Sequence, residues 1–230
     1  MIDSILVLNA GSSSIKFSVE APAGPGSVRM LAVGQIEGIG THVHFVAKDA
    51  DGTVLADEPY NVDPGRMAYA PQAFAGLARL GAAGAVLVVV SNQPGVAKGL
   101  FPASALEPVH TRLAAMFRAA GAHLDGFYWC PHHPDGVVEG YAGACDCRKP
   151  RPGLLLRAAR ELGLDLRASW LIGDILDDVE AGNLAGCRSI LLDVGHETEW
   201  RAGPQRVPFG RAPDLDAAAR IVLAAAAGEA

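Results

Sequence analysis

The stretch Val86-Leu-Val-Val-Val-Ser91 is a continuous apolar run, which is typical of a parallel strand buried on both faces. Similar runs recur over residues 126–130, 170–174 and 189–193. Helical periodicity separates them, and we expect helices over residues 71–83, 103–120, 153–164 and 177–185. This alternation predicts an α/β fold, a Rossmann-like parallel sheet with helices on both faces. Ligands of such sheets bind at the carboxyl ends of the strands.

The N-terminal part of the chain has a different pattern. Short β-type runs over residues 5–9, 15–20, 30–39 and 42–47 are separated by turns such as residues 21–26. We expect an N-terminal β-meander over residues 1–44 and an α/β domain over residues 45–230, with a metal-binding loop at residues 130–147. Residues 203–213 are expected to form a loop that leads to a C-terminal helix over residues 217–227.

Composition excludes several classes of function. The 230 residues are 50% hydrophobic and carry a net charge of −6, which argues against nonspecific nucleic-acid binding. The apolar run Ile5–Leu8 is far too short for a signal or a membrane span. We therefore expect a cytoplasmic protein that binds neither nucleic acid nor membrane, and we expect it to be a monomer.

Three of the four cysteines lie in two closely spaced groups, Cys130-Pro-His132-His133 and Cys145-Asp-Cys147. Thiolates and imidazole are ligands that a tetrahedral zinc ion prefers, so Cys130, His132, Cys145 and Cys147 are the expected zinc ligands. Free structural thiols are the alternative, because disulfides are rare in a reducing cytoplasm. Cys187 stands alone before an apolar strand and is expected to be a buried thiol.

Residues suited to phosphate chemistry follow several of the expected strands. The stretch that begins with Ser91 and Asn92 ends one strand with a hydroxyl and backbone amides, and Asp174 ends another with a Mg²⁺-binding carboxylate. Lys149 adds a positive charge two residues after the second cysteine group. Asp177 and Asp178 follow Asp174 and offer further carboxylates for Mg²⁺, but a helix N-cap is the favoured interpretation of Asp177.

The pair Asp49-Ala-Asp51-Gly-Thr53 follows the apolar residues Val43 to Ala47. Two such carboxylates can divide attack on phosphorus from transfer of the leaving-group proton. A hairpin turn is the alternative, because Asp and Gly tolerate the backbone dihedrals of tight turns.

These motifs resemble, in this order, the haloacid dehalogenase (HAD) superfamily of phosphatases. The similarity runs from about Asp49 to Trp200 and is greatest to the zinc-containing branch that includes heptose-1,7-bisphosphate phosphatase and histidinol phosphatase. It is carried by sequences at residues 49–54, 59–64, 88–99, 130–134, 145–150 and 172–174.

The resemblance implies a Mg²⁺-dependent phosphatase with a structural Zn²⁺. Its expected substrate is a small phosphorylated metabolite, with a sugar bisphosphate such as D-glycero-D-manno-heptose 1,7-bisphosphate as the leading candidate. Asp49 would be the nucleophile and Asp51 the general acid, while Ser91 and Lys149 would stabilise the phosphoryl group. The Mg²⁺ would be held by Asp49, the Asp51 carbonyl and Asp174. The implied substrate-binding residues are Asn92, Arg148 and Lys98.

A second resemblance covers Ile5-Leu-Val-Leu-Asn9 through Phe17, which is similar to the start of acetate kinases, and it plausibly extends into the Asp49 region. In that family Asn9 and the serine-rich turn contribute to the phosphate and metal site. The chain is too short for a complete kinase of this type, so an acetate kinase fragment is a remote alternative. Since Lys48 suits an exposed hairpin, a zinc-bearing fusion protein that binds phosphate or a partner without turnover is the main alternative.

Overall fold

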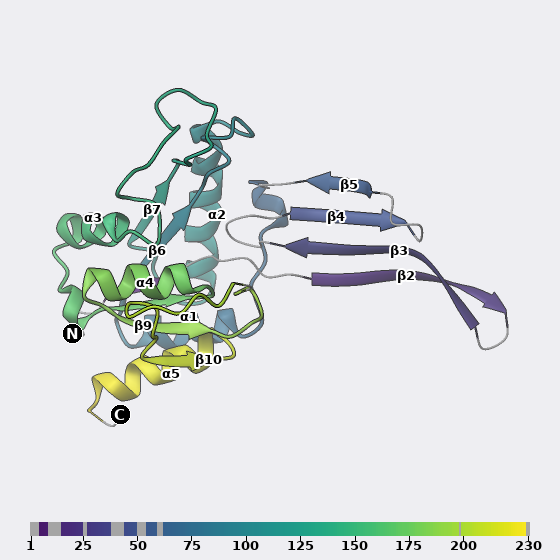
Figure 1. Ribbon diagram of the computed structural model, residues 1–230. Coiled ribbons are helices and arrows are strands. Elements are labelled where there is room, and N and C mark those ends of the chain that lie inside the picture. The colour runs from purple at the N-terminus through teal and green to yellow at the C-terminus, as the bar shows by residue number, and fades with distance from the viewer. Residues whose placement is uncertain are drawn as a thin grey trace. The chain divides into compact units, whose positions relative to one another are not determined.

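A computed structural model divides the chain into two compact units, residues 1–10 with 62–230 and residues 11–61 (Figure 1). It describes the backbone of residues 5–8, 15–24, 27–37, 44–49, 54–58, 62–197 and 199–228, and the side chains of the last two ranges. The division differs from the boundary expected near residue 44 in two ways: residues 45–61 belong to the smaller unit, and the first ten residues belong to the larger one.

The larger unit contains a six-stranded sheet with the order β10-β9-β8-β1-β6-β7, and every pair of neighbours is parallel. Its strands, in chain order, are β1 (Ile5–Leu8), β6 (Val86–Asn92), β7 (Gly126–Cys130), β8 (Trp170–Gly173), β9 (Arg188–Leu192) and β10 (Gly210–Ala212). Because all six run in one direction, their carboxyl ends meet at a single edge.

Helices cover both faces of this sheet. Leu87 and Val89 of β6 pack into one hydrophobic cluster, whereas Val88 and Val90 pack into another on the opposite face. The first cluster includes residues of α1 (Ala73–Ala82), α2 (Leu106–Ala119) and α5 (Leu215–Ala226), and the second includes residues of α3 (Gly153–Leu162) and α4 (Leu176–Ala185). Figure 1 shows α3 and α4 near one another, and the two helices make contact. The predicted α/β fold class is confirmed.

The smaller unit is a four-stranded antiparallel sheet in which consecutive strands are neighbours. Its strands are β2 (Ile15–Gly24), β3 (Ser27–Glu37), β4 (His44–Asp49) and β5 (Val54–Glu58). The expected β-meander is therefore confirmed for β2, β3 and β4, whereas β5 was not expected.

Two expectations about the strands were wrong. Ile5–Leu8 does not belong to the meander but forms β1, between β6 and β8. Its four residues are all apolar, which suits a strand covered on both faces. The stretch 203–213, expected to be a loop, contains β10 at the edge of the parallel sheet.

Short 3-10 turns complete the described part of the chain: η1 (Pro64–Arg66), η2 (Ala103–Ala105) and η3 (Leu166–Ala168). The turn η2 directly precedes α2, so the helix expected from residue 103 begins as a tighter turn. Among the described residues, every helix is too short or too polar to cross a lipid bilayer.

Candidate active site

Lys149 is a buried cation beside the carboxyl end of β6. Its side chain is 3% exposed, and its Nζ lies 2.8 Å from Oδ1 of Asp178, which is fully buried. The same Nζ donates a hydrogen bond of 3.3 Å to the carbonyl of Val90, the residue before Ser91. Burial of a charge is costly unless it is paired, so Asp178 stabilises the ammonium at this place.

Asp178 also shapes the turn that carries Asp174. Its Oδ2 accepts hydrogen bonds from the backbone N–H groups of Asp174 and Ile175, at 3.2 and 3.3 Å. The residue that caps α4 is Ile175, so the interpretation of Asp177 as the N-cap was wrong. Asp177 instead pairs with Arg206 at 2.6 Å. Lys149 and Asp174, expected to share a site, are thus joined through Asp178.

Asn92 holds the backbone of Lys149 in place. Its Nδ2 donates to the Lys149 carbonyl at 3.1 Å, and its Oδ1 accepts from the Lys149 N–H at 3.0 Å. Both ends of the amide are therefore used within the protein. The neighbouring Ser91 is buried, and its Oγ accepts a hydrogen bond from Gln93 at 2.9 Å.

Asp174 follows β8 and supplies a buried carboxylate at the same edge of the sheet. Burial raises the pKa of Asp174 above its ordinary value, and the hydrogen bond with His196 opposes that rise. An anionic oxygen is the type of ligand that Mg²⁺ prefers, so Asp174 fits the role expected for it.

The structure places Asp49 at the last position of β4, opposite Ala32 of β3 in the antiparallel sheet. Asp49 was expected in the α/β domain of residues 45–230, and this was wrong, because its strand belongs to the antiparallel sheet. His44 and Lys48 make β4 less apolar than β1, which pairs with both β6 and β8. The side chain of Asp49 and the whole of Asp51 lie outside the described residues, as does Asn9, which follows β1.

The four expected zinc ligands lie together. One ligand atom from each of Cys130, His132, Cys145 and Cys147 falls within 4.8 Å of all the others. The three sulfur atoms are 3.1, 3.3 and 3.5 Å apart, and Nδ1 of His132 lies 3.4 and 3.6 Å from two of them. A tetrahedral ion with Zn–S bonds of about 2.3 Å has edges of about 3.8 Å, which is up to about 0.7 Å longer than the distances here. The Cys₃His donor set therefore fits zinc in its chemistry, and small outward shifts of the ligands would accommodate the ion.

The zinc ligands adjoin the buried lysine. The N–H of Arg148 donates to Sγ of Cys145 at 3.3 Å, and Lys149 is the next residue. Metal binding at the cysteines would therefore fix the backbone that enters the Asn92 contacts. Cys187, expected to be a core thiol, is buried and is not one of the four clustered ligands, and burial raises the pKa of its thiol to about 12.

Removal of zinc is expected to detach this loop from the sheet. In Cys147→Ser, zinc content measured by atomic absorption should fall well below the one equivalent per chain of the parent protein, because one thiolate is lost. Limited proteolysis should then cut within residues 131–146. The matched control is Cys187→Ala, which should keep one equivalent of zinc and an intact loop. Full zinc content in Cys147→Ser would contradict the ligand assignment.

A positively charged group lies beside the zinc loop. The ring of His133 is partly buried, and burial together with the nearby charges of Arg148 and Lys98 lowers its pKa. Both cations act on this imidazole, and the charge of Asp135 opposes their effect on its pKa. Nη1 of Arg148 donates to the carbonyl of His132 at 3.5 Å. This group lies on segments that follow β6 and β7, at the same edge of the sheet as Lys149.

Gly173 is required by the close approach of Asp178. A Cβ atom at Gly173 would lie 2.3 Å from Cβ of Asp178 and 2.5 Å from its carboxylate. Gly173→Ala should therefore displace Asp178 from Lys149 and lower the free energy of unfolding by about 1–3 kcal/mol, measured by urea denaturation. Gly210→Ala, where the nearest atom is 3.9 Å away, should change it by less than about 0.5 kcal/mol. Equal stability of the two variants would contradict this packing.

Comparison with known proteins identifies relatives of this chain. Residues 146–218 match a family described as HAD-hydrolase-like. The D-glycero-beta-D-manno-heptose-1,7-bisphosphate 7-phosphatase of Photorhabdus laumondii is 40% identical over 137 residues, which cover 60% of this chain and 73% of the relative. The protein of the same name from Escherichia coli K12 is 35% identical, and the alignment covers 70% of this chain and 80% of the relative.

Solved structures give the same result. The D,D-heptose 1,7-bisphosphate phosphatase from B. bronchiseptica, complexed with magnesium and phosphate, has a TM-score of 0.60 and 32% identity, covering 70% of this chain and 87% of that one. A putative HAD-like phosphatase from Mesorhizobium loti has a TM-score of 0.60 and 33% identity, covering 73% and 81%.

Proposed function

Because the chain belongs to the HAD-like hydrolase family that includes the heptose-1,7-bisphosphate phosphatases, we propose that it is a Mg²⁺-dependent phosphatase of a small sugar bisphosphate, such as D-glycero-D-manno-heptose 1,7-bisphosphate. The observation that carries the proposal is the chain of contacts from Val90, beside Ser91, through Lys149 and Asp178 to Asp174. It brings a cation and a metal-binding carboxylate to one end of the sheet.

Each residue has a definite part in this reaction. Lys149 and Ser91 stabilise the transferring phosphoryl group, and Asp174 holds the metal. Bound Mg²⁺ would neutralise charge on the phosphate oxygens. Asp49 attacks phosphorus and forms an aspartyl-phosphate, while Asp51 donates a proton to the leaving group and then activates water. The sequence Asp49-Ala-Asp51-Gly-Thr53 supports these two roles.

The positive group beside the zinc loop favours a substrate with two anionic ends. Arg148 and Lys98 would bind the phosphate that is not cleaved, while Lys149 engages the one that is. The Asn92 side-chain amide is hydrogen-bonded to the backbone of Lys149. Asn92 would therefore contribute to substrate binding by positioning Lys149. We propose further that the enzyme is a cytoplasmic monomer.

The test is phosphate release from the heptose 1,7-bisphosphate and from the matching 1- and 7-monophosphates, with zinc-loaded protein and with Mg²⁺ present or omitted. We expect Mg²⁺-dependent release, with kcat/KM for the bisphosphate at least about tenfold above that for either monophosphate. Arg148→Ala should reduce this preference and leave zinc content unchanged. Absence of Mg²⁺-dependent release from all three compounds would contradict the proposal.

The position of β1 favours a second candidate, a protein that binds phosphate without turnover. The strand between β6 and β8 is β1, and it leads into Asn9 instead of an aspartate. Asn cannot replace Asp as a nucleophile toward phosphorus, so a site completed by Asn9 would bind phosphate only. Calorimetric binding of orthophosphate, together with no phosphate release, would select this candidate.

A further inference from the structure

We propose that His196 is a positioning residue that orients the Asp174 carboxylate for its metal ion. The inference rests on the proposed function, because it takes Asp174 as the Mg²⁺ ligand. It concerns the segment after β9, which was not expected to contribute to the site.

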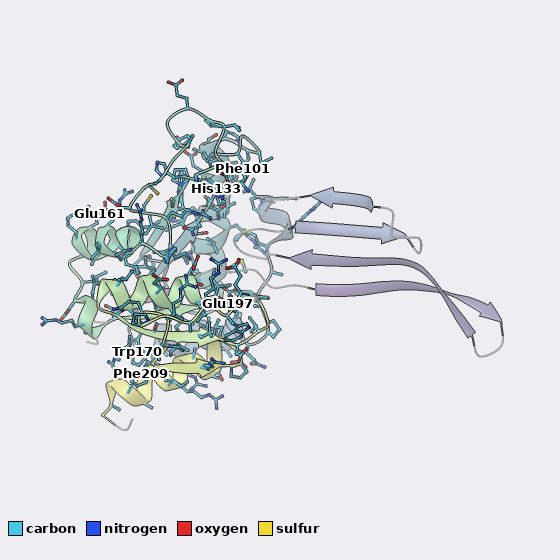
Figure 2. The ribbon with its side chains drawn as sticks, viewed as in Figure 1. Phe101, His133, Glu161, Trp170, Glu197 and Phe209 are labelled. Atoms are coloured by element: carbon cyan, nitrogen blue, oxygen red, sulfur yellow. The ribbon has the colours of Figure 1, made fainter. Side chains whose placement is uncertain are left out.

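Glu197 anchors this segment to the first turn of α4. Its Oε2 accepts the N–H of Leu176 at 2.6 Å, and its Oε1 accepts the N–H groups of Glu199 and Trp200 at 2.8 and 3.2 Å. Burial opposes ionisation, but these N–H groups lower the pKa of Glu197 below its ordinary value. Figure 2 labels Glu197, which lies on a loop close to the end of α4 that carries Leu176. A carboxylate at a helix N-terminus is favourable, so the loop is held firmly.

The anchored loop brings the preceding residue onto Asp174. Nδ1 of His196 lies 2.6 Å from Oδ2 of Asp174, and the two side chains are 9% and 5% exposed. An ionised carboxylate can only accept, so Nδ1 is the protonated nitrogen in this contact. Hydrogen bonds of this kind orient metal-binding side chains and fix which oxygen faces the ion.

Asp174 is thus fixed at two points. Asp178 holds its backbone N–H, and His196 holds one carboxylate oxygen. His196 thus restrains the carboxylate at Oδ2. Loss of His196 removes this restraint, and a metal ion would have to supply the lost order on binding.

The test measures metal affinity in the zinc-loaded full chain, with no dependence on turnover. Mn²⁺, a hard cation like Mg²⁺, is titrated while free ion is followed by electron paramagnetic resonance. His196→Leu should weaken Mn²⁺ binding about 10- to 100-fold. His196→Asn can place an amide N–H where Nδ1 lies, so it should recover most of the affinity. Unchanged zinc content and thermal midpoint show that the variants are folded.

Two results would overturn the inference, and they differ from failure of the proposed function. Equal Mn²⁺ affinity of His196→Leu and the parent protein removes the positioning role alone. Equal weakening by His196→Leu and His196→Asn shows that the hydrogen bond has no part in it. Asp174→Asn serves as the reference for loss of the metal site. If it binds Mn²⁺ as tightly as the parent, Asp174 is not the ligand, and the metal site in the proposed function fails as well.

Discussion

Lys149→Met is expected to lower phosphate release about 10²- to 10³-fold, because it removes a preorganised positive charge from the developing charge of the phosphoryl group. It should also destabilise the fold. Lys149 is the partner of the fully buried Asp178, and removing one member of a buried pair costs about 3–5 kcal/mol. Urea denaturation and a phosphate-release assay measure the two effects separately.

A double variant separates catalysis from stability. Asp178→Asn removes the uncompensated charge while its amide oxygen can still accept the N–H groups of Asp174 and Ile175. In Lys149→Met/Asp178→Asn, stability should therefore recover in part, whereas activity should not. Recovery of activity together with stability would contradict a direct role of Lys149 in the reaction.

A surface ion pair provides the matched control. Arg157 and Glu161 lie 2.8 Å apart, but their side chains are 57% and 43% exposed. Water and salt screen such a pair, so Arg157→Met should change the free energy of unfolding by less than about 1 kcal/mol and leave phosphate release unchanged. If Arg157→Met lost as much stability and activity as Lys149→Met, burial of Lys149 would not be the cause of its large effect.

Local patterns were enough to predict most of the larger unit. Continuous apolar runs such as Val86–Asn92 and Gly126–Cys130 were located to within a residue, because strands buried on both faces require them. Helix α5 was also expected, from its run of alanine and aliphatic residues. The short strand β10 was missed, because Gly210–Ala212 has no apolar run and pairs at an edge with β9.

The remaining misassignments have one physical cause, which is pairing between distant segments. Ile5–Leu8 has the same local pattern in a meander or a parallel sheet, and only its pairing with Val86–Val89 and Trp170–Ile172 distinguishes them. Arg206 was likewise not expected to pair with Asp177, which lies 29 residues before it.

In the candidate site too, features local in the sequence were predicted, whereas contacts between distant residues were not. The zinc ligands were predicted because their chemistry and spacing are local to residues 130–147, and the structure brings all four together. The contacts of Asn92 with Lys149, and of His196 with Asp174, span 57 and 22 residues. For Asp178, a signal was present: it lies one helical turn after Asp174, where its side chain can return to the start of the helix.

Asp49→Asn is expected to abolish phosphate release, lowering it by about 10⁴-fold or more, because an amide cannot form the aspartyl-phosphate. The variant should keep its zinc, since the Cys₃His ligands belong to the other unit. Asp57→Asn is the matched control, because Asp57 lies on β5 in the same antiparallel sheet as Asp49. It should leave phosphate release unchanged.

The most direct measurement is therefore phosphate release by the parent protein and by Asp49→Asn at equal zinc content. Rapid release by the parent and none by the variant would show that the reaction requires the Asp49 carboxylate. Undiminished release by the variant, or none by the parent, would contradict this. If the parent protein releases no phosphate but still binds orthophosphate at Lys149, it is a phosphate-binding protein.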